Sequence, residues 1–149
     1  MKSMKHADIT IINAKGLILG RMASVIAKRL LQGESIIVLN AEKAAISGKR
    51  LQIVKDAKTF LEVGHPRKGP YHPRMPDKIV RRTIRGMLPR KKPKGKQAYK
   101  RLKVYLGTPR EFDGEETQTI PESNVKRLKS PYITVEELAK EIGWTPEGE

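Results

Sequence analysis

The residues of this chain best suited to chemistry are arginines and lysines gathered in one stretch. Residues 65–103 hold 15 Lys or Arg and a single acid, Asp77, whereas residues 107–149 hold 5 Lys or Arg and 10 acids. The formal net charge of the chain is +15, so nearly the whole excess lies in residues 65–103. Such a concentration is typical of a surface that binds the phosphate groups of a nucleic acid.

A stretch rich in proline and glycine, residues 64–75, begins the basic region. Its three prolines and two glycines exclude a regular helix or a central strand, so we expect an extended loop. Pro76 suits the first turn of a helix that runs to about Leu88 and ends at Pro89. The cluster at residues 90–96 packs like charges among prolines and glycine, and we expect it to order only with a counter-charge.

Helical spacing divides residues 76–88 into two chemically different faces. One arc of about 100° holds only cations, Lys78, Arg81, Arg82 and Arg85. The other side holds Val80, Thr83, Ile84, Met87 and Leu88, with Ile79 at its edge. The planar fork of arginine makes two-point contacts with phosphate oxygens. We therefore expect this helix to dock on the domain through one face and to present its cations on the other.

Solvent exposure and a membrane surface account less well for this concentration of charge. A solvated charged face would carry balancing acids, and residues 65–103 have one acid for fifteen bases. A membrane surface would require large apolar residues such as Trp or Phe on the inserting face, and this stretch has neither. DNA is harder to exclude on charge alone, although no helix-turn-helix, zinc-finger or basic-zipper pattern is visible.

The remaining motifs do not support catalysis or cofactor binding. Gly16 and Gly20 follow a predicted strand and open a helix, but their spacing matches neither nucleotide-binding glycine pattern. His65 and His72 have almost no acids nearby, which disfavours a divalent metal site. Cysteine is absent, so disulfides and thiolate sites are excluded. We expect no catalytic, cofactor-binding or metal-binding residues, and no small-molecule substrate.

The candidate RNA-contacting residues are the cations of the basic region and a few neighbours. The helix N-terminus beside Arg21 is one candidate phosphate site, and Tyr71 and Tyr99 could stack on unpaired bases. The full candidate set is Arg21, Lys49, Arg67, Lys68, Tyr71, His72, Arg74, Lys78, Arg81, Arg82, Arg85, Arg90, Lys91, Lys92, Lys94, Lys96, Lys100 and Arg101.

The elements that must position these residues follow a strand–helix–strand order. Residues 9–12 and 35–39 are β-branched or apolar runs, and residues 21–32 between them have helical periodicity. This order predicts a parallel sheet with a right-handed crossover. We further expect a helix at 51–61, a strand at 102–106, irregular structure at 107–131, and a final helix capped by Thr134 and ended by Gly143.

The length of 149 residues favours one domain. We place its core at about 8–63 and 76–106, the basic arm at about 64–103 and an acidic C-terminal extension at 107–149. The first eight residues are charged and lack the apolar region of a secretory signal. No apolar run approaches the roughly 20 residues of a membrane span.

Several of these segments resemble the large-subunit ribosomal protein thirteen family, in particular its archaeal and eukaryotic branch. The resemblance covers roughly residues 9–113, and the Arg-Gly-Met-Leu-Pro run at 85–89 is its most specific part. The other matching segments are residues 20–24, 40–43, 47–48, 69–72, 81–84 and 101–105. Residues 114–149 match no motif of the family.

The resemblance implies a three-layer α/β/α domain around a short, mostly parallel four-stranded sheet, with a basic loop-helix arm and a C-terminal helical extension. It also implies a non-enzymatic, cytoplasmic protein of the large ribosomal subunit that binds large-subunit ribosomal RNA and adjoins other ribosomal proteins. The alternatives left open are a non-ribosomal RNA- or DNA-binding α/β protein and, less favoured, a small nucleotide-binding enzyme.

Overall fold

A short parallel sheet and the helices on one of its faces organise the molecule. The computed structural model describes residues 9–62 and 73–146. Its sheet has the strand order β1-β2-β4, with both neighbouring pairs parallel. The strands are β1 (Ile9–Asn13), β2 (Ser35–Leu39) and β4 (Leu102–Val104). The expected α/β class and mostly parallel sheet are confirmed.

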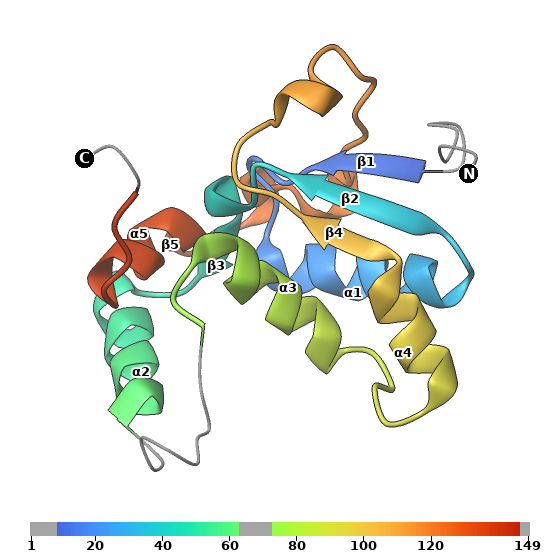
Figure 1. Ribbon diagram of the computed structural model, residues 1–149. Coiled ribbons are helices and arrows are strands. Elements are labelled where there is room, and N and C mark those ends of the chain that lie inside the picture. Colours follow the sequence, from blue (N-terminus) through green and yellow to red (C-terminus); the bar gives the residue numbers. More distant parts are fainter. Residues whose placement is uncertain (1–8, 63–72, 147–149) are drawn as a thin grey trace.

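Three helices lie against one face of this sheet (Figure 1). They are α1 (Leu19–Leu31), α3 (Pro76–Gly86) and α4 (Pro93–Lys100). Strand side chains alternate between the two faces, so Ile36 and Val38 of β2 pack toward these helices. Met22, Ile26 and Leu30 of α1 meet them there, each without exposed surface. This cluster is the main hydrophobic core.

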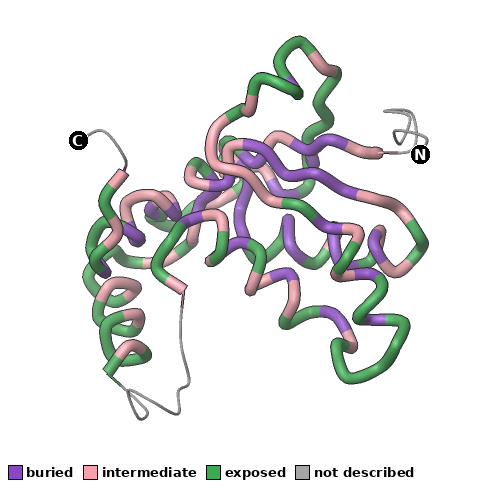
Figure 2. The backbone as a smooth tube through the Cα atoms, viewed as in Figure 1, coloured by how far each residue is buried: buried purple, intermediate pink, exposed green. Residues whose placement is uncertain are grey.

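On the opposite face of the sheet, no α-helix of the described residues covers the strands. Ile11, Ile37 and Leu39 form a second cluster with Phe112, which lies on the short 3-10 helix η3 (Arg110–Phe112). Tyr105 packs against Phe112 with ring centroids 5.5 Å apart. The expected second helical layer is therefore replaced by an irregular segment that brings one aromatic side chain onto the sheet. Both faces of β2 are buried, as the run at 35–39 predicts (Figure 2).

The two remaining strands of the described residues form a separate antiparallel pair, and neither was expected from the sequence. After β2 the chain makes the 3-10 turn η2 (Ala41–Lys43), and then β3 (Ala45–Ser47) pairs with β5 (Tyr132–Thr134). The large sheet therefore has three strands instead of four. Asn40, with φ 56°, lies between β2 and η2, and β3 then pairs with β5 and not with the large sheet.

Two further helices lie to one side of the sheet, α2 (Arg50–Glu62) and α5 (Val135–Glu141) (Figure 1). The Thr134 hydroxyl caps α5 by accepting a hydrogen bond from the Glu137 N–H at 3.2 Å, as predicted. Residues between β4 and β5 are irregular apart from 3-10 turns, also as predicted; these include η4 (Pro121–Ser123) and η5 (Val125–Arg127). No helix in the two described ranges combines the length and apolar character needed to cross a membrane.

Candidate nucleic-acid interface

The amphipathic helix α3 positions the first group of candidate cations. Val80, Ile84 and Leu88 recur every four residues and are almost fully buried against α1 and the sheet. Lys78 and Arg81 are exposed, and Arg82 and Arg85 are partly exposed. The expected division into a docked apolar face and a cationic face is therefore seen in the structure. Met87 departs from it, because this side chain is 44% exposed just after the helix ends.

Part of the basic cluster after α3 is helical, namely residues 93–96, whereas residues 90–92 form the turn before them. The expectation that residues 90–96 order only with a counter-charge stays a prediction. Helix α4 begins at Pro93 and buries Gly95 and Ala98 against its surroundings. A side chain on Gly95 would collide with the carbonyl group of Pro89, so glycine alone permits the tight return of the chain. This close approach defines the path of the chain between the end of α3 and the first turn of α4.

The charged side chains of this segment point away from the core. The backbone from Arg90 to Lys94 is exposed along its whole course between α3 and α4 (Figure 2). The exposed cations of the connection and of α4 are Arg90, Lys91, Lys92, Lys94, Lys96 and Lys100. With Lys78, Arg81, Arg82 and Arg85 of α3 they form what we call the α3–α4 cation surface.

A cation–π contact joins the two helices of this surface. The Arg81 guanidinium of α3 lies 4.7 Å from the centre of the Tyr99 ring of α4. Tyr99 is itself partly buried and packs against the main core. Its ring therefore packs against the exposed Arg81 side chain from the side of the core, a role that the suggestion of base stacking did not anticipate.

Arg101 differs from the other candidates because the fold uses part of its guanidinium. One terminal nitrogen, Nη2, donates a hydrogen bond to the Leu30 carbonyl at the end of α1. Its Nε is buried and has no hydrogen-bond partner among the described residues. Arg101 thus ties the start of β4 to the last turn of α1, where a cation also interacts favourably with the helix dipole.

The remaining described candidates lie around α3 and α2. Arg21 is exposed in the first turn of α1 and lines a cavity of about 420 Å³ together with Ser47 and Thr83 of α3. Lys49 is exposed directly before α2, and Arg74 is exposed two residues before α3 begins. Arg21 is therefore close to α3. Four candidates lie outside the described residues: Arg67, Lys68, Tyr71 and His72. His65 also lies outside them.

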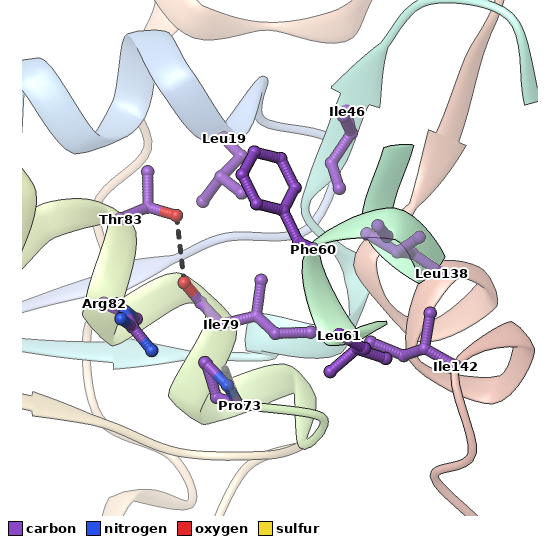
Figure 3. A pocket seen from close by; sticks show the side chains of 11 residues that line it. Leu19, Ile46, Phe60, Leu61, Pro73, Ile79, Arg82, Thr83, Leu138 and Ile142 are labelled. Carbon is purple, nitrogen blue, oxygen red and sulfur yellow. Dashed lines mark hydrogen bonds between the residues drawn. The ribbon is translucent and has the colours of Figure 1, made fainter. Parts of the chain in front are cut away.

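Sequence reasoning missed an apolar groove between α2, α3 and α5 (Figure 3). It has a volume of about 400 Å³, and Phe60, Leu61, Ile79, Leu138 and Ile142 are among its lining residues. Phe60 is 60% exposed at this groove. Arg82 reaches the groove from the cationic side of α3. No single segment signals the groove, because its walls come from three helices far apart in the chain.

Acidic side chains balance cations elsewhere in the molecule. Arg50 at the start of α2 binds Glu137 at 3.0 Å and Glu141 at 2.8 Å on α5. Arg29 of α1 binds Glu34 at 2.9 Å. By contrast, the only acid in the described residues 73–103 is Asp77, in the first turn of α3. The unbalanced positive charge is therefore concentrated on α3, α4 and the connection between them.

Comparison of the chain with known proteins identifies its family. A family model described as ribosomal protein L13 matches residues 7–111. The chain is 45% identical to the large ribosomal subunit protein uL13 of Saccharolobus solfataricus, over 97% of this chain and 99% of that protein. It is 46% identical to the protein of that name from Methanopyrus kandleri, over 99% of this chain and 94% of that protein. It is 47% identical to uL13 of Methanocaldococcus jannaschii, over 91% of this chain and 98% of that protein. The chain belongs to the ribosomal protein L13 family.

Proposed function

We propose that this chain is a structural, non-enzymatic component of the large ribosomal subunit that binds and stabilises large-subunit ribosomal RNA. The observation that carries the proposal is the α3–α4 cation surface: ten exposed or partly exposed lysines and arginines lie on α3, α4 and their connection, and Asp77 is the single acid in the sequence from 73 to 103. Membership of the ribosomal protein L13 family supports the ribosomal assignment over a non-ribosomal nucleic-acid-binding protein.

The proposed mechanism is electrostatic. RNA helices repel one another through their phosphates, and a rigid basic surface placed between them removes part of that repulsion. The parallel sheet and α1 hold α3 in place through Val80 and Ile84, so the cations are presented from a fixed base. Binding of this kind depends mainly on phosphate contacts and RNA shape, because the major groove of an A-form helix is too deep and narrow to be read.

Two further groups of residues extend the proposal. Arg21, Lys49 and Arg74 are exposed cations next to α1, α2 and α3, and we include them in the RNA-binding set together with Arg67, Lys68, Tyr71 and His72. Arg101 belongs to the set through its position, although it already donates to Leu30. The exposed acids of the segment after β4, such as Glu111, Asp113 and Glu122, would instead face neighbouring, basic ribosomal proteins.

The proposal is tested by changing Arg81, Arg82 and Arg85 together to Gln, which preserves length and helix propensity. Affinity for transcribed large-subunit ribosomal RNA of Saccharolobus solfataricus is measured at several salt concentrations. We expect weaker binding and a salt slope that is shallower by about two to three units, one for each lost phosphate contact. Circular dichroism should show an unchanged fold.

The matched control changes Lys126, Arg127 and Lys129 to Gln, three cations outside the α3–α4 cation surface. This control should leave affinity and slope close to those of the native chain. If the control lost both while the α3 variant kept both, the RNA-binding surface would be misplaced.

A further inference from the structure

The Arg81–Tyr99 contact carries an inference about how the RNA-binding surface is organised. Several described arginines use their N–H donors within the protein; for example, Arg29 donates to Glu34, Arg50 to Glu137 and Glu141, and Arg101 to Leu30. Arg81 is held differently, because its partner is the face of an aromatic ring. An arginine stacked in this way keeps its five donors, which all lie in the guanidinium plane.

Tyr99 is well suited to fix a neighbouring side chain. It lies on α4 directly after Ala98, which is fully buried, and its ring packs against the main core. The start of α4 is also fixed, since Gly95 is packed closely against the Pro89 carbonyl. The ring is therefore anchored by the core, and the exposed Arg81 is anchored by the ring.

We propose that Tyr99 is a positioning residue for RNA binding, which stacks on Arg81 and holds its guanidinium donors ready for a phosphate of the RNA. This inference rests on the proposed function, since it concerns the same α3–α4 cation surface. A free arginine loses rotamer freedom when it binds, and a stacked arginine has already lost most of it before the RNA arrives. Because Arg81 lies on α3 and Tyr99 on α4, the contact also joins the two helices that carry the cations.

The test compares the full-length native chain with Tyr99→Leu, Tyr99→Phe and Arg81→Gln, and with the double variant of Tyr99→Leu and Arg81→Gln. The probe is the same transcribed ribosomal RNA, at an ionic strength of about 0.1 M. Tyr99→Leu removes the ring but keeps apolar bulk, and we expect it to weaken binding about twofold to fivefold. Tyr99→Phe keeps a ring face and should remain within about twofold of the native affinity.

The double variant separates positioning from a general structural role. In the Arg81→Gln background there is no guanidinium to position, so Tyr99→Leu should cause no further loss of affinity. Arg81→Gln alone should make the salt slope shallower by about one unit. If Tyr99→Leu weakened binding equally in both backgrounds, Tyr99 would act through the fold or by stacking on a base, and the inference would be overturned.

A second variant avoids any effect on the core. Arg81→Lys changes only an exposed side chain and keeps its charge, but it removes the planar group that stacks on Tyr99. We expect it to weaken binding about as much as Tyr99→Leu, and the two losses should not add. Native affinity in Arg81→Lys would overturn the inference even if Tyr99→Leu proved too unstable to assay.

The outcomes also distinguish this inference from the proposed function. If the Arg81, Arg82 and Arg85 variant kept native affinity and slope, the proposed RNA surface itself would fail. If that variant bound weakly while Tyr99→Leu and Arg81→Lys bound normally, only the positioning role would fail. Tyr132→Leu serves as the control tyrosine, because Tyr132 is 48% exposed on β5, outside the α3–α4 cation surface, and its removal should leave binding unchanged.

Discussion

At the scale of single residues, some cations of this protein form ion pairs that hold the fold together, and others are exposed on the α3–α4 cation surface. Arg29 illustrates the structural kind: its Nε and Nη2 both donate to the Glu34 carboxylate at 2.9 Å, and Glu34 also accepts from the Thr10 hydroxyl at 3.3 Å. These hydrogen bonds lower the pKa of Glu34 and raise that of Arg29, and burial opposes both shifts. The pair joins the last turn of α1 to the segment that enters β2.

The Arg29–Glu34 pair predicts a pH-dependent contribution to stability. Because the folded-state pKa of Glu34 is lowered, its contribution is present above the unfolded-state value of about 4.3 and is lost as pH falls through the folded-state value. Glu34→Gln should lower the free energy of unfolding at neutral pH by at most about 1 kcal/mol, since both side chains are partly exposed. Denaturant titrations should show that this difference disappears in acid. A difference that persisted at low pH would contradict the pairing.

Gly95 predicts a larger effect on stability. Gly95→Ala should lower the free energy of unfolding by about 1–3 kcal/mol, because the new methyl group would overlap the Pro89 carbonyl. Gly86→Ala is the matched control, since an added methyl group there meets nothing within 4 Å. It should be neutral or stabilise by up to about 1 kcal/mol. Thermal denaturation of the two variants measures both effects, and equal behaviour would show that the close approach at Gly95 is not maintained.

At the scale of elements, the acid-rich C-terminal part is built into the fold. β5 pairs with β3, and Val135 and Ala139 of α5 have no exposed surface. Arg50 additionally links α2 to α5 through Glu137 and Glu141. Deletion of residues 132–149 would therefore expose the core as well as remove negative charge. The contribution of this segment to stability is therefore better measured with single substitutions than with a deletion.

Leu138→Ala provides such a point change. Leu138 is 7% exposed and packs with Ile133 and Ile142 beside the apolar groove. Its truncation should lower the free energy of unfolding by about 2–5 kcal/mol, toward the lower end because the groove leaves one side open. Glu136→Gln, which loses only an ion pair to Lys140 one turn away, should cost a few tenths of a kcal/mol. A stable Leu138→Ala variant would argue that α5 is not packed as described.

Elements with a strong local pattern were predictable from the sequence. The periodicity of residues 21–32 and the apolar run at 35–39 correspond to α1 and β2 within one or two residues. The β3–β5 pair was not predictable, because each strand has three residues and the partners are separated by more than 80 positions. The start of α4 was not predictable for a different reason. The path of the chain there depends on the close approach of Gly95 to Pro89, which composition does not reveal.

At the scale of the whole molecule, charge is segregated along the chain and across the fold. The cations of residues 73–103 gather on α3, α4 and their connection, and these helices share one face of the sheet. The location of this surface could be inferred from sequence because charge and helical spacing are local properties. The stacking of Tyr99 under Arg81 could not, because it depends on how two helices pack against each other.

This segregation predicts an unusual response of the free protein to salt. Like charges on the α3–α4 cation surface repel one another, and screening shortens their range from about 30 Å at 0.01 M ionic strength to about 8 Å at 0.15 M. The melting temperature of the free chain should therefore rise over this range. The rise should be smaller for the variant that carries Gln at Arg81, Arg82 and Arg85, because repulsion among the remaining cations is weaker.

The Lys126, Arg127 and Lys129 variant is the informative comparison for that prediction. It loses the same number of charges, but from the segment after β4 where acids outnumber bases. Removing cations there leaves the repulsion within the α3–α4 cation surface intact, so its salt-induced rise in melting temperature should stay closer to that of the native chain than the rise of the Arg81, Arg82 and Arg85 variant does. Differential scanning calorimetry of the three proteins decides the point. Equal rises in all three would mean that repulsion is spread over the whole surface and is not concentrated on α3 and α4.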